Sequence, residues 1–281
     1  MTQLSDIKGD DWERLASEYT KISSNTTIAP IGIMLDRANA LSPFSEAFGI
    51  LDNGCGPGPV MSRLIKDYGT TIPRSCSLTC SDFSEGMLKQ VMSTKEKSDA
   101  ASPWKRVETL LQNAMDLGEI ADESQTHVTA GLVYFMTPDP RKCLSESRRV
   151  LKEGGVLSLS SWEGSQWMEL LKLVAKVWPD KQLPTLPEEW SSTTAVEGEL
   201  KKAGFRDVES YRVPVEMSFE SQESIVEFLV TKLPHVVAMS KDKSEEDVAR
   251  LKRVMVDEAK KMCPAAPGKL DGVAIVGIGR K

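Results

Sequence analysis

Short runs of apolar residues alternate along the chain with longer stretches in which apolar residues recur every three or four positions. Residues 48–51 form one apolar run, and Val60, Met61 and Leu64 beyond it share one face of a helix. Strands are predicted at 48–51, 77–80, 106–111, 127–135, 156–161, 208–213 and 271–278. Strands that alternate with helices in this way predict βαβ units and a parallel, doubly wound sheet.

The helical pattern changes along the chain. A helix is expected to begin at Pro140 and to end at the pair Gly154-Gly155, and extra amphipathic segments follow the fifth and sixth strands. The expected organisation is a single domain with a helical cap at 1–45, a core at 46–162, helical insertions at 163–203 and 217–268, and strands completing the sheet at 204–216 and 269–281. The insertions would cover a crevice at the strand ends.

Charge and composition exclude several classes of protein. With 35 basic and 41 acidic residues the chain has a net charge of −6 and no basic block, so neither nucleic acid nor an anionic membrane is an expected partner. The acidic N-terminus lacks the apolar stretch of a secretory signal, and no apolar run approaches the roughly 18 residues that span a bilayer. We therefore expect a cytoplasmic protein that acts on a small molecule, and we infer no obligate protein partner.

The cysteines and histidines do not predict a metal site. Cys55, Cys76, Cys80, Cys143 and Cys263 show no paired CxxC spacing, and two histidines are too few to complete a zinc cage. Reduced thiols and no metal are expected.

The clearest chemical signal is a glycine-rich turn after the first predicted strand. Asp52 is followed by Gly54, Gly56 and Gly58. Glycine permits tight backbone torsions and lets a ligand approach the main chain ahead of a helix N-terminus. The second strand ends at Asp82, where a carboxylate can accept both hydroxyls of a ribose. A plain tight turn would explain the glycines alone, but the glycines together with Asp82 predict a nucleotide-type site.

These motifs resemble those of the class I S-adenosylmethionine-dependent methyltransferases. Four blocks carry the resemblance: ILDNGCGPG (50–58), LTCSDFSEGML (78–88), QNAMDL (112–117) and THVTAG…PDP…RVLKEGGVLSLSSW (126–162). The resemblance implies a Rossmann-like α/β fold, doubly wound around a seven-stranded, mostly parallel sheet, with helical lid insertions after strands 5 and 6. It also implies S-adenosylmethionine as the cofactor.

Roles for individual residues follow from the matching positions. The glycines of the turn would admit the aminocarboxypropyl arm, whose amino group Asp52 would hold. Asp82 would bind the ribose, Phe83 and Met87 would flank the adenine, and the side-chain oxygen of Asn113 would accept from the adenine amino group. The full implied cofactor-binding set is Tyr19, Asp52, Gly54, Cys55, Gly56, Gly58, Asp82, Phe83, Met87, Asn113, Ala114, Met115 and Gly131.

Within that superfamily the chain resembles the fungal small-molecule methyltransferases typified by the gliotoxin bis-thiomethyltransferase. LDNGCG, LTCSDFSEGML, GFRDV (204–208) and DGVAIVGIG (271–279) carry this likeness. It departs at 132–136, which would form part of the substrate floor, and in the lid helices. The likeness implies methylation of a thiol, in a dithiol of the epipolythiodioxopiperazine type, in fungal secondary metabolism.

Substrate contacts are less clearly indicated. The candidate substrate-binding residues are Met34, Tyr134, Phe135, Trp162, Trp167 and His235, although methionines and aromatics at helical spacing also fill cores. His235 follows the helix-breaking Pro234 and is the one candidate for a catalytic base. His127 opens a buried strand and is expected to be structural.

Several functions remain open. A thiol with a pKa of about 8.5 is already a few per cent thiolate at neutral pH, whereas an alcohol needs a base. The scarcity of histidine therefore favours sulfur or amine acceptors. The alternatives are O- or N-methylation of another secondary metabolite, a lyase or pericyclase of the same fold that binds S-adenosylmethionine, and a non-catalytic partner.

Overall fold

The computed structural model describes the backbone of residues 16–281 and the side chains of residues 26–281. In this part of the chain seven strands form one sheet in the order β3-β2-β1-β4-β5-β7-β6. The strands are β1 (Gly49–Asn53), β2 (Ser77–Asp82), β3 (Val107–Leu111), β4 (Gln125–Gly131), β5 (Leu151–Ser165), β6 (Arg206–Phe219) and β7 (Gly268–Arg280). Strands β1 to β5 are parallel and β7 runs antiparallel between β5 and β6. The expected α/β class and mostly parallel sheet are confirmed.

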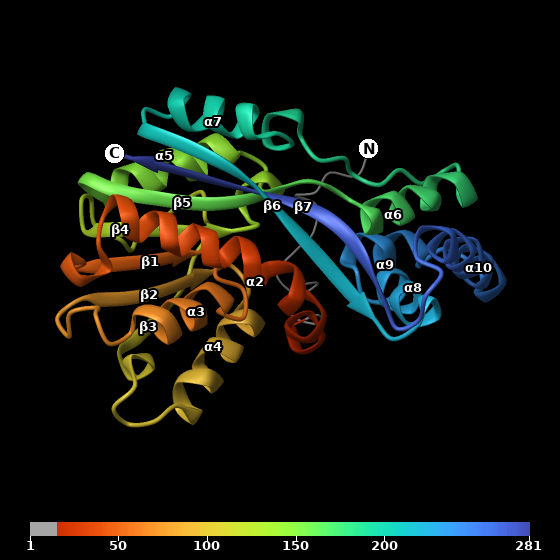
Figure 1. Ribbon diagram of the computed structural model, residues 1–281, viewed down its shortest axis with the longest axis horizontal. Helices are drawn as coiled ribbons and strands as arrows, with labels where there is room; N and C mark the ends of the chain where they lie inside the picture. Colours follow the sequence, from red (N-terminus) through yellow and green to blue (C-terminus); the bar gives the residue numbers. More distant parts are fainter. Residues whose placement is uncertain (1–15) are drawn as a thin grey trace.

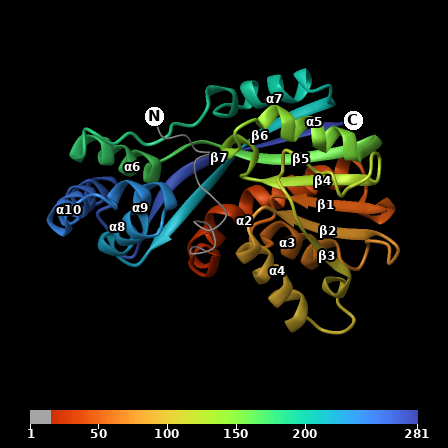
Figure 2. The same cartoon turned by 180° about the vertical axis from the view of Figure 1, so that it is seen from behind.

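Helices cover both faces of the sheet (Figures 1 and 2). The helices are α2 (Ala16–Leu41), α3 (Pro59–Tyr68), α4 (Glu85–Lys97), α5 (Pro140–Val150), α6 (Gln166–Val177), α7 (Thr193–Lys202), α8 (Gln222–Thr231), α9 (Pro234–Ser240) and α10 (Glu245–Met262). Side chains of a strand point alternately to its two faces, so Ile50 packs with α2, α3 and α4, and Leu51 packs with α5 and α7.

The antiparallel pair β6 and β7 extends beyond the other strands of the sheet and packs against a separate group of helices (Figure 1). We define this helical lobe as α6, α8, α9 and α10. Val213, Val215, Met217 and Phe219 recur at every second position of β6 and pack against these helices in their own hydrophobic core. The alternation is typical of a strand with one buried face. Three helices of the lobe thus connect β6 to β7, and α6 joins them from the end of β5.

The strand predicted at 127–135 is half wrong, because β4 ends at Gly131. Leu132 adopts a left-handed backbone with φ of 58°, and Tyr134–Met136 form a short 3-10 helix, η4. Apolarity identified this segment as buried, but a short buried apolar run does not distinguish a strand from a tight helical turn.

The predicted helix end is also wrong. Helix α5 ends at Val150, and Leu151 already pairs with Gln125 as the first residue of β5. Gly154, with φ of 79°, therefore lies within β5, where the pairing shifts register before Val156. The glycine pair marks an irregular strand and not a helix C-terminus, because the chain passes directly from helix to sheet.

The two helices of the insertion predicted at 163–203 pack in different hydrophobic cores. Helix α6 belongs to the helical lobe, whereas α7 contributes Val196 and Leu200 to the core on the α5 face of the sheet. Helix α7 is thus an ordinary covering helix of the sheet, and 163–203 does not form one lid.

Candidate functional site

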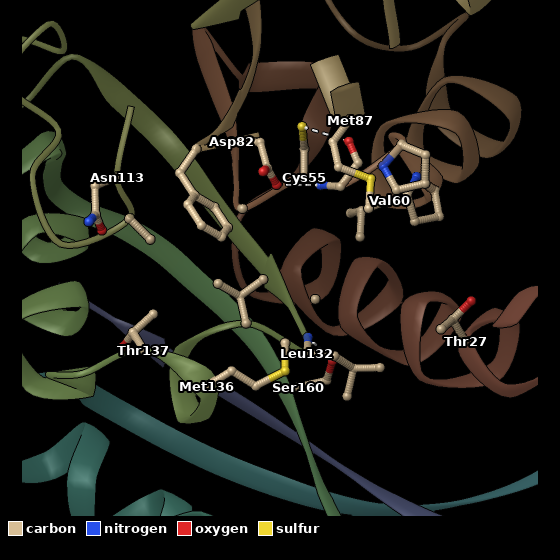
Figure 3. Close-up of a pocket in the computed structure, with 18 of the residues that line it drawn as sticks. Thr27, Cys55, Val60, Asp82, Met87, Asn113, Leu132, Met136, Thr137 and Ser160 are labelled. Atoms are coloured by element: carbon tan, nitrogen blue, oxygen red, sulfur yellow. Dashed lines mark hydrogen bonds between the residues drawn. The ribbon is translucent and has the colours of Figure 1, made fainter. Parts of the chain in front are cut away.

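A cavity of about 250 Å³ lies at the carboxyl ends of the parallel strands (Figure 3). Its wall follows the strand order: the residues after β3, the end of β2, the glycine turn after β1, the segment after β4, and one residue of β5. Helix α2 contributes Thr27, Pro30 and Ile31 from the side. In open α/β sheets ligands bind at this edge, where the strand order reverses.

The glycine turn leaves space that side chains would occupy. Gly54 and Gly56 have φ of 70° and 54°, a region that residues with a Cβ rarely adopt. A Cβ on Gly54 would come within 2.6 Å of Val133 Cγ1, whereas one on Gly56 would meet nothing within 4 Å. Gly58 lies behind the wall, where a Cβ would approach Val91 at 3.2 Å. Gly54 therefore makes room for the Val133 side chain, Gly56 leaves open space at the cavity, and Gly58 admits a neighbouring helix.

Asp52 lies behind the glycine turn with one carboxylate oxygen unmatched. Its Oδ1 accepts a hydrogen bond from Thr129 Oγ1 at 2.9 Å, while Oδ2 is buried and has no hydrogen-bond partner among the described residues. Burial raises the pKa of Asp52 to about 7, and the nearby Asp82 adds to this shift. Asp52 is not among the residues that line the cavity, so its contact with the amino group of a ligand stays a prediction.

Asp82 joins the end of β2 to the glycine turn. Its Oδ2 accepts from the Gly56 amide at 2.8 Å and its Oδ1 accepts from the Ser84 amide at 2.9 Å. Burial raises the pKa of Asp82, although these amide hydrogen bonds oppose the shift. Phe83 beside it remains 48% exposed and presents a ring to the cavity. This arrangement suits the sugar and base of a nucleoside.

The turn after β3 contains a residue that sequence reasoning missed. The Asn113 side-chain oxygen, expected to face a base, accepts from the Met115 amide at 2.9 Å within its own turn. Gln112 also lines the cavity, and both polar atoms of its amide are buried without hydrogen-bond partners in the described structure. The available signal was a polar side chain directly after the edge strand, next to Asn113.

The far end of the cavity, beyond β4, is mostly apolar. It is formed by Ile31, Leu132, Val133, Met136 and Pro138 together with the hydroxyl-bearing Thr137 and Ser160. Figure 3 shows Leu132 and Met136 across the cavity from Asp82 and Met87. We call this the acceptor end. Among the described lining residues, no histidine, lysine, arginine, aspartate or glutamate lies here, since the one ionisable carboxylate in the wall is Asp82.

Most predicted cofactor residues come together in this wall. They are Gly54, Cys55, Gly56, Asp82, Phe83, Met87, Asn113, Ala114, Met115 and Gly131. Tyr19 falls within α2, but its side chain lies outside the described residues.

The predicted substrate residues on the β4 segment do not reach the wall. Tyr134 is 1% exposed, and its hydroxyl accepts from Asn53 Nδ2 at 3.0 Å and hydrogen-bonds Ser147 Oγ. Phe135 packs with Leu144 on the α5 face of the sheet. The left-handed backbone at Leu132 turns both rings away from the cavity, so that Met136 and Thr137 take their place.

The remaining predicted substrate residues belong to the helical lobe or its border. Met34 and Trp167 lie in the lobe core, and Trp162 packs edge-on against Trp167 with ring centroids 5.4 Å apart. His235 lies in the first turn of α9. Within the described residues no cavity-lining position comes from 163–268, although Figure 1 shows the lobe on the side of the sheet towards which the parallel strands point.

The described residues contain no group of three or more histidine, cysteine, aspartate or glutamate side chains placed to hold a metal ion. No helix among them is long and apolar enough to cross a membrane.

Comparison with known proteins adds the family. Residues 51–159 match a family described as a methyltransferase domain. Methyltransferase ucsB of an Acremonium species is 42% identical over 275 residues, which cover 97% of this chain and 95% of that protein. Methyltransferase tpcH of Aspergillus fumigatus is 31% identical over 245 residues, covering 83% and 84%. An acetylaranotin bis-thiomethyltransferase of Aspergillus terreus is 24% identical over 233 residues, covering 80% and 78%.

Solved structures share the fold. The cyclase SpnF superposes with a TM-score of 0.57 at 16% identity, covering 97% of this chain and 94% of that one. An N-methyltransferase of Haemonchus contortus, solved with S-adenosylhomocysteine, has a TM-score of 0.52 at 18% identity and covers 96% and 58%. With 42% identity to a fungal methyltransferase over almost its whole length and a matching methyltransferase domain, the chain belongs to the class I S-adenosylmethionine-dependent methyltransferases, for which S-adenosylmethionine is the methyl donor.

Proposed function

We propose that this enzyme methylates thiol sulfur on a small apolar dithiol of fungal secondary metabolism. The observation that carries the proposal is the acceptor end of the cavity, whose described lining is apolar apart from the hydroxyls of Thr137 and Ser160 and holds no charged side chain or histidine able to act as a general base. The related acetylaranotin bis-thiomethyltransferase supports sulfur as the acceptor atom.

The cofactor would occupy the part of the cavity between β3 and β4. We propose that Asp52 holds its ammonium group, that the open space at Gly56 leaves room for its amino-acid arm, and that Asp82 binds the ribose hydroxyls. Phe83 and Asn113 would contact the base. When bound, the cofactor supplies an electrophilic methyl group on a sulfonium.

The acceptor end explains why sulfur suits this site. An alcohol would need a positioned base to remove its proton, which typically contributes about 10²- to 10⁴-fold in rate. A thiol with a pKa of about 8.5 ionises by itself to a useful extent near neutral pH. Leu132, Met136 and Ile31 can then act by orienting the acceptor and excluding water, since well-oriented reactants reach effective molarities of about 10⁵ M and above.

We further propose that the enzyme acts in the cytosol on a free small molecule. All five cysteines are unpaired, which supports a reducing compartment.

The experiment compares matched acceptors. We expect ortho-xylylenedithiol to be methylated and the corresponding diol to be inert, with S-adenosylhomocysteine formation as the measurement. The rate should rise with pH along one limb with a midpoint of about 8–9. His235→Ala should cost less than about tenfold, because α9 lies outside the described cavity wall. Transfer confined to the diol, or collapse of thiol methylation in His235→Ala with intact cofactor binding, would contradict the proposal.

A further inference from the structure

Ser160 is a buried polar residue in the floor of the acceptor end. It lies on β5 directly beside Gly131, the last residue of β4, and is 3% exposed. It contributes to the cavity wall together with Leu132 and Met136, and Figure 3 shows the three side by side below the cavity. It lies within the block 126–162 that carries the family resemblance, but that resemblance implies no role for it.

The Ser160 hydroxyl has one hydrogen bond to spare. Its oxygen accepts from the Leu132 amide at 3.1 Å, which supports the left-handed backbone of Leu132. The hydroxyl hydrogen has no acceptor among the described residues, although a buried hydroxyl normally donates as well as accepts. The unused donor lies at the wall of a cavity where a ligand can accept it.

The neighbouring hydroxyl is already committed. Thr137 also lines the acceptor end, but its Oγ1 donates to the Tyr134 carbonyl at 2.8 Å. Ser160 thus offers an uncommitted donor in surroundings of low polarity, where a hydrogen bond to a charged atom is stronger than in water.

Titratable groups around Ser160 do not supply this stabilisation. They are Asp52 and Cys55 at the turn after β1, Asp82 on β2, Tyr134 on η4 and Cys143 on α5. The carboxylates would repel a thiolate, and burial raises the pKa of Cys55, Tyr134 and Cys143, so these three remain neutral. The cavity-facing part of α2, residues 26–35, contains no titratable side chain.

We propose that the Ser160 hydroxyl donates a hydrogen bond to the acceptor sulfur, stabilises its thiolate and holds it at the floor of the acceptor end. This inference rests on the proposed thiol acceptor. The thiol first releases its proton to solvent. The acceptor sulfur then forms the new bond to the methyl carbon with its own electron pair, while the bond from that carbon to the sulfonium breaks and leaves its pair on a neutral thioether. The Ser160 hydrogen bond weakens as the sulfur loses its charge and the product can leave.

The test measures ionisation of a bound acceptor without turnover. Enzyme, S-adenosylhomocysteine and ortho-xylylenedithiol form a dead-end complex, and ultraviolet absorbance of the thiolate is followed against pH. Because hydrogen bonding to the charged form lowers a pKa, we expect the wild-type midpoint to lie below that of the free dithiol. Ser160→Ala should raise the midpoint by about one pH unit, and Ser160→Thr, which keeps the hydroxyl, should restore it.

Ser158→Ala is the matched control. Ser158 lies on the same strand and the same face, is fully buried, and donates to the Met34 carbonyl at 3.1 Å outside the cavity wall. It should leave the thiolate midpoint unchanged. Binding of S-adenosylhomocysteine to Ser160→Ala, measured by calorimetry, shows whether the variant keeps its cofactor site when the Leu132 amide loses its acceptor.

The outcomes separate the two proposals. If wild-type enzyme methylates the dithiol but Ser160→Ala shows the wild-type midpoint, the inference about Ser160 is wrong and the thiol acceptor stands. If wild-type enzyme methylates no thiol, the proposed function fails first. A raised midpoint in Ser160→Ala with unchanged binding of S-adenosylhomocysteine, rescued by Ser160→Thr and absent in Ser158→Ala, establishes the role of Ser160.

Discussion

Asp52 shows how the fold can hold a single residue in an unfavourable environment. Its carboxylate is buried beside Asp82 with one oxygen unmatched, which raises the pKa of Asp52 to about 7. An ammonium group would supply both a hydrogen-bond donor and the opposite charge. Part of the free energy of binding would then come from pairing a buried carboxylate that has no partner in the free enzyme.

We therefore expect the affinity for S-adenosylhomocysteine to depend on pH through Asp52. Below about pH 7 the free enzyme carries a protonated Asp52, so the dissociation constant should rise towards tenfold per pH unit as the pH falls. Asp52→Asn should weaken binding by about ten- to a hundredfold at pH 8 and remove the pH dependence. Titration calorimetry measures both, with Asp139→Asn, an exposed helix cap, as control. Equal pH profiles for wild type and Asp52→Asn would contradict the assignment.

At the scale of elements, one buried amide joins the segments that form the cavity. Asn53 at the end of β1 accepts from Ser81 Oγ on β2 at 3.2 Å. Its Nδ2 donates to the hydroxyl of Tyr134 on η4 and to the carbonyl of Ala114 after β3. Tyr134 also hydrogen-bonds Ser147 on α5. The network therefore fixes the base-lining turn and the acceptor-lining segment against the same strand.

Tyr134→Phe separates a structural role from substrate contact. Removing the hydroxyl leaves buried polar groups on Asn53 and Ser147 less satisfied, so we expect unfolding free energy to fall by about 1–3 kcal/mol while the acceptor KM stays within about twofold. Denaturant unfolding and steady-state kinetics measure the two effects. Ser147→Ala removes the same contact from α5, so the double variant should be less destabilised than the sum of the single ones. A raised KM with unchanged stability would instead place the phenol against the substrate.

At the scale of the whole molecule, two buried groups oppose each other in the pH dependence of folding. The folded pKa of Asp52 lies above its ordinary value of 3.8, so its stabilising contribution is fully present below about pH 4 and is lost as pH rises through about 7. Burial lowers the pKa of His127 from 6.5 to about 4, and its Nε2 donates to the Ser42 carbonyl at 2.8 Å. The contribution of neutral His127 is present above pH 6.5 and is lost as pH falls through about 4.

In enzyme free of cofactor, single variants should show that Asp52 and His127 change the unfolding free energy with pH in opposite directions. Relative to wild type, Asp52→Asn should gain on the order of 4 kcal/mol of unfolding free energy as pH rises from about 4 to 7. His127→Gln should lose about 3 kcal/mol relative to wild type as pH rises from about 4 to 6.5. Urea unfolding at several pH values measures these differences. Curves that run parallel to wild type would show that neither group titrates on unfolding in this range.

Short apolar runs that alternate with helical stretches were sufficient to predict the class of fold. A parallel strand is buried on both faces, so its consecutive residues are mostly apolar and the strand can be recognised in the sequence. The glycine turn, Asp52 and Asp82 could also be placed, since each lies at the carboxyl end of a strand and such ends meet at one edge of the sheet. Each of these features can be recognised in a short stretch of sequence, or follows from the order of strands and helices along the chain.

Only the tertiary structure decided which side chains form the acceptor end. Periodicity reports that Tyr134, Met34 and Trp167 are buried, but not against what, and folding places all three in cores away from the cavity. The left-handed backbone at Leu132 rotates Met136 into the wall in place of Tyr134, and strand pairing brings Ser160 beside Gly131, 29 residues earlier in the chain. Neither event has a local sequence signature, because each depends on hydrogen bonds between elements that are distant in the chain.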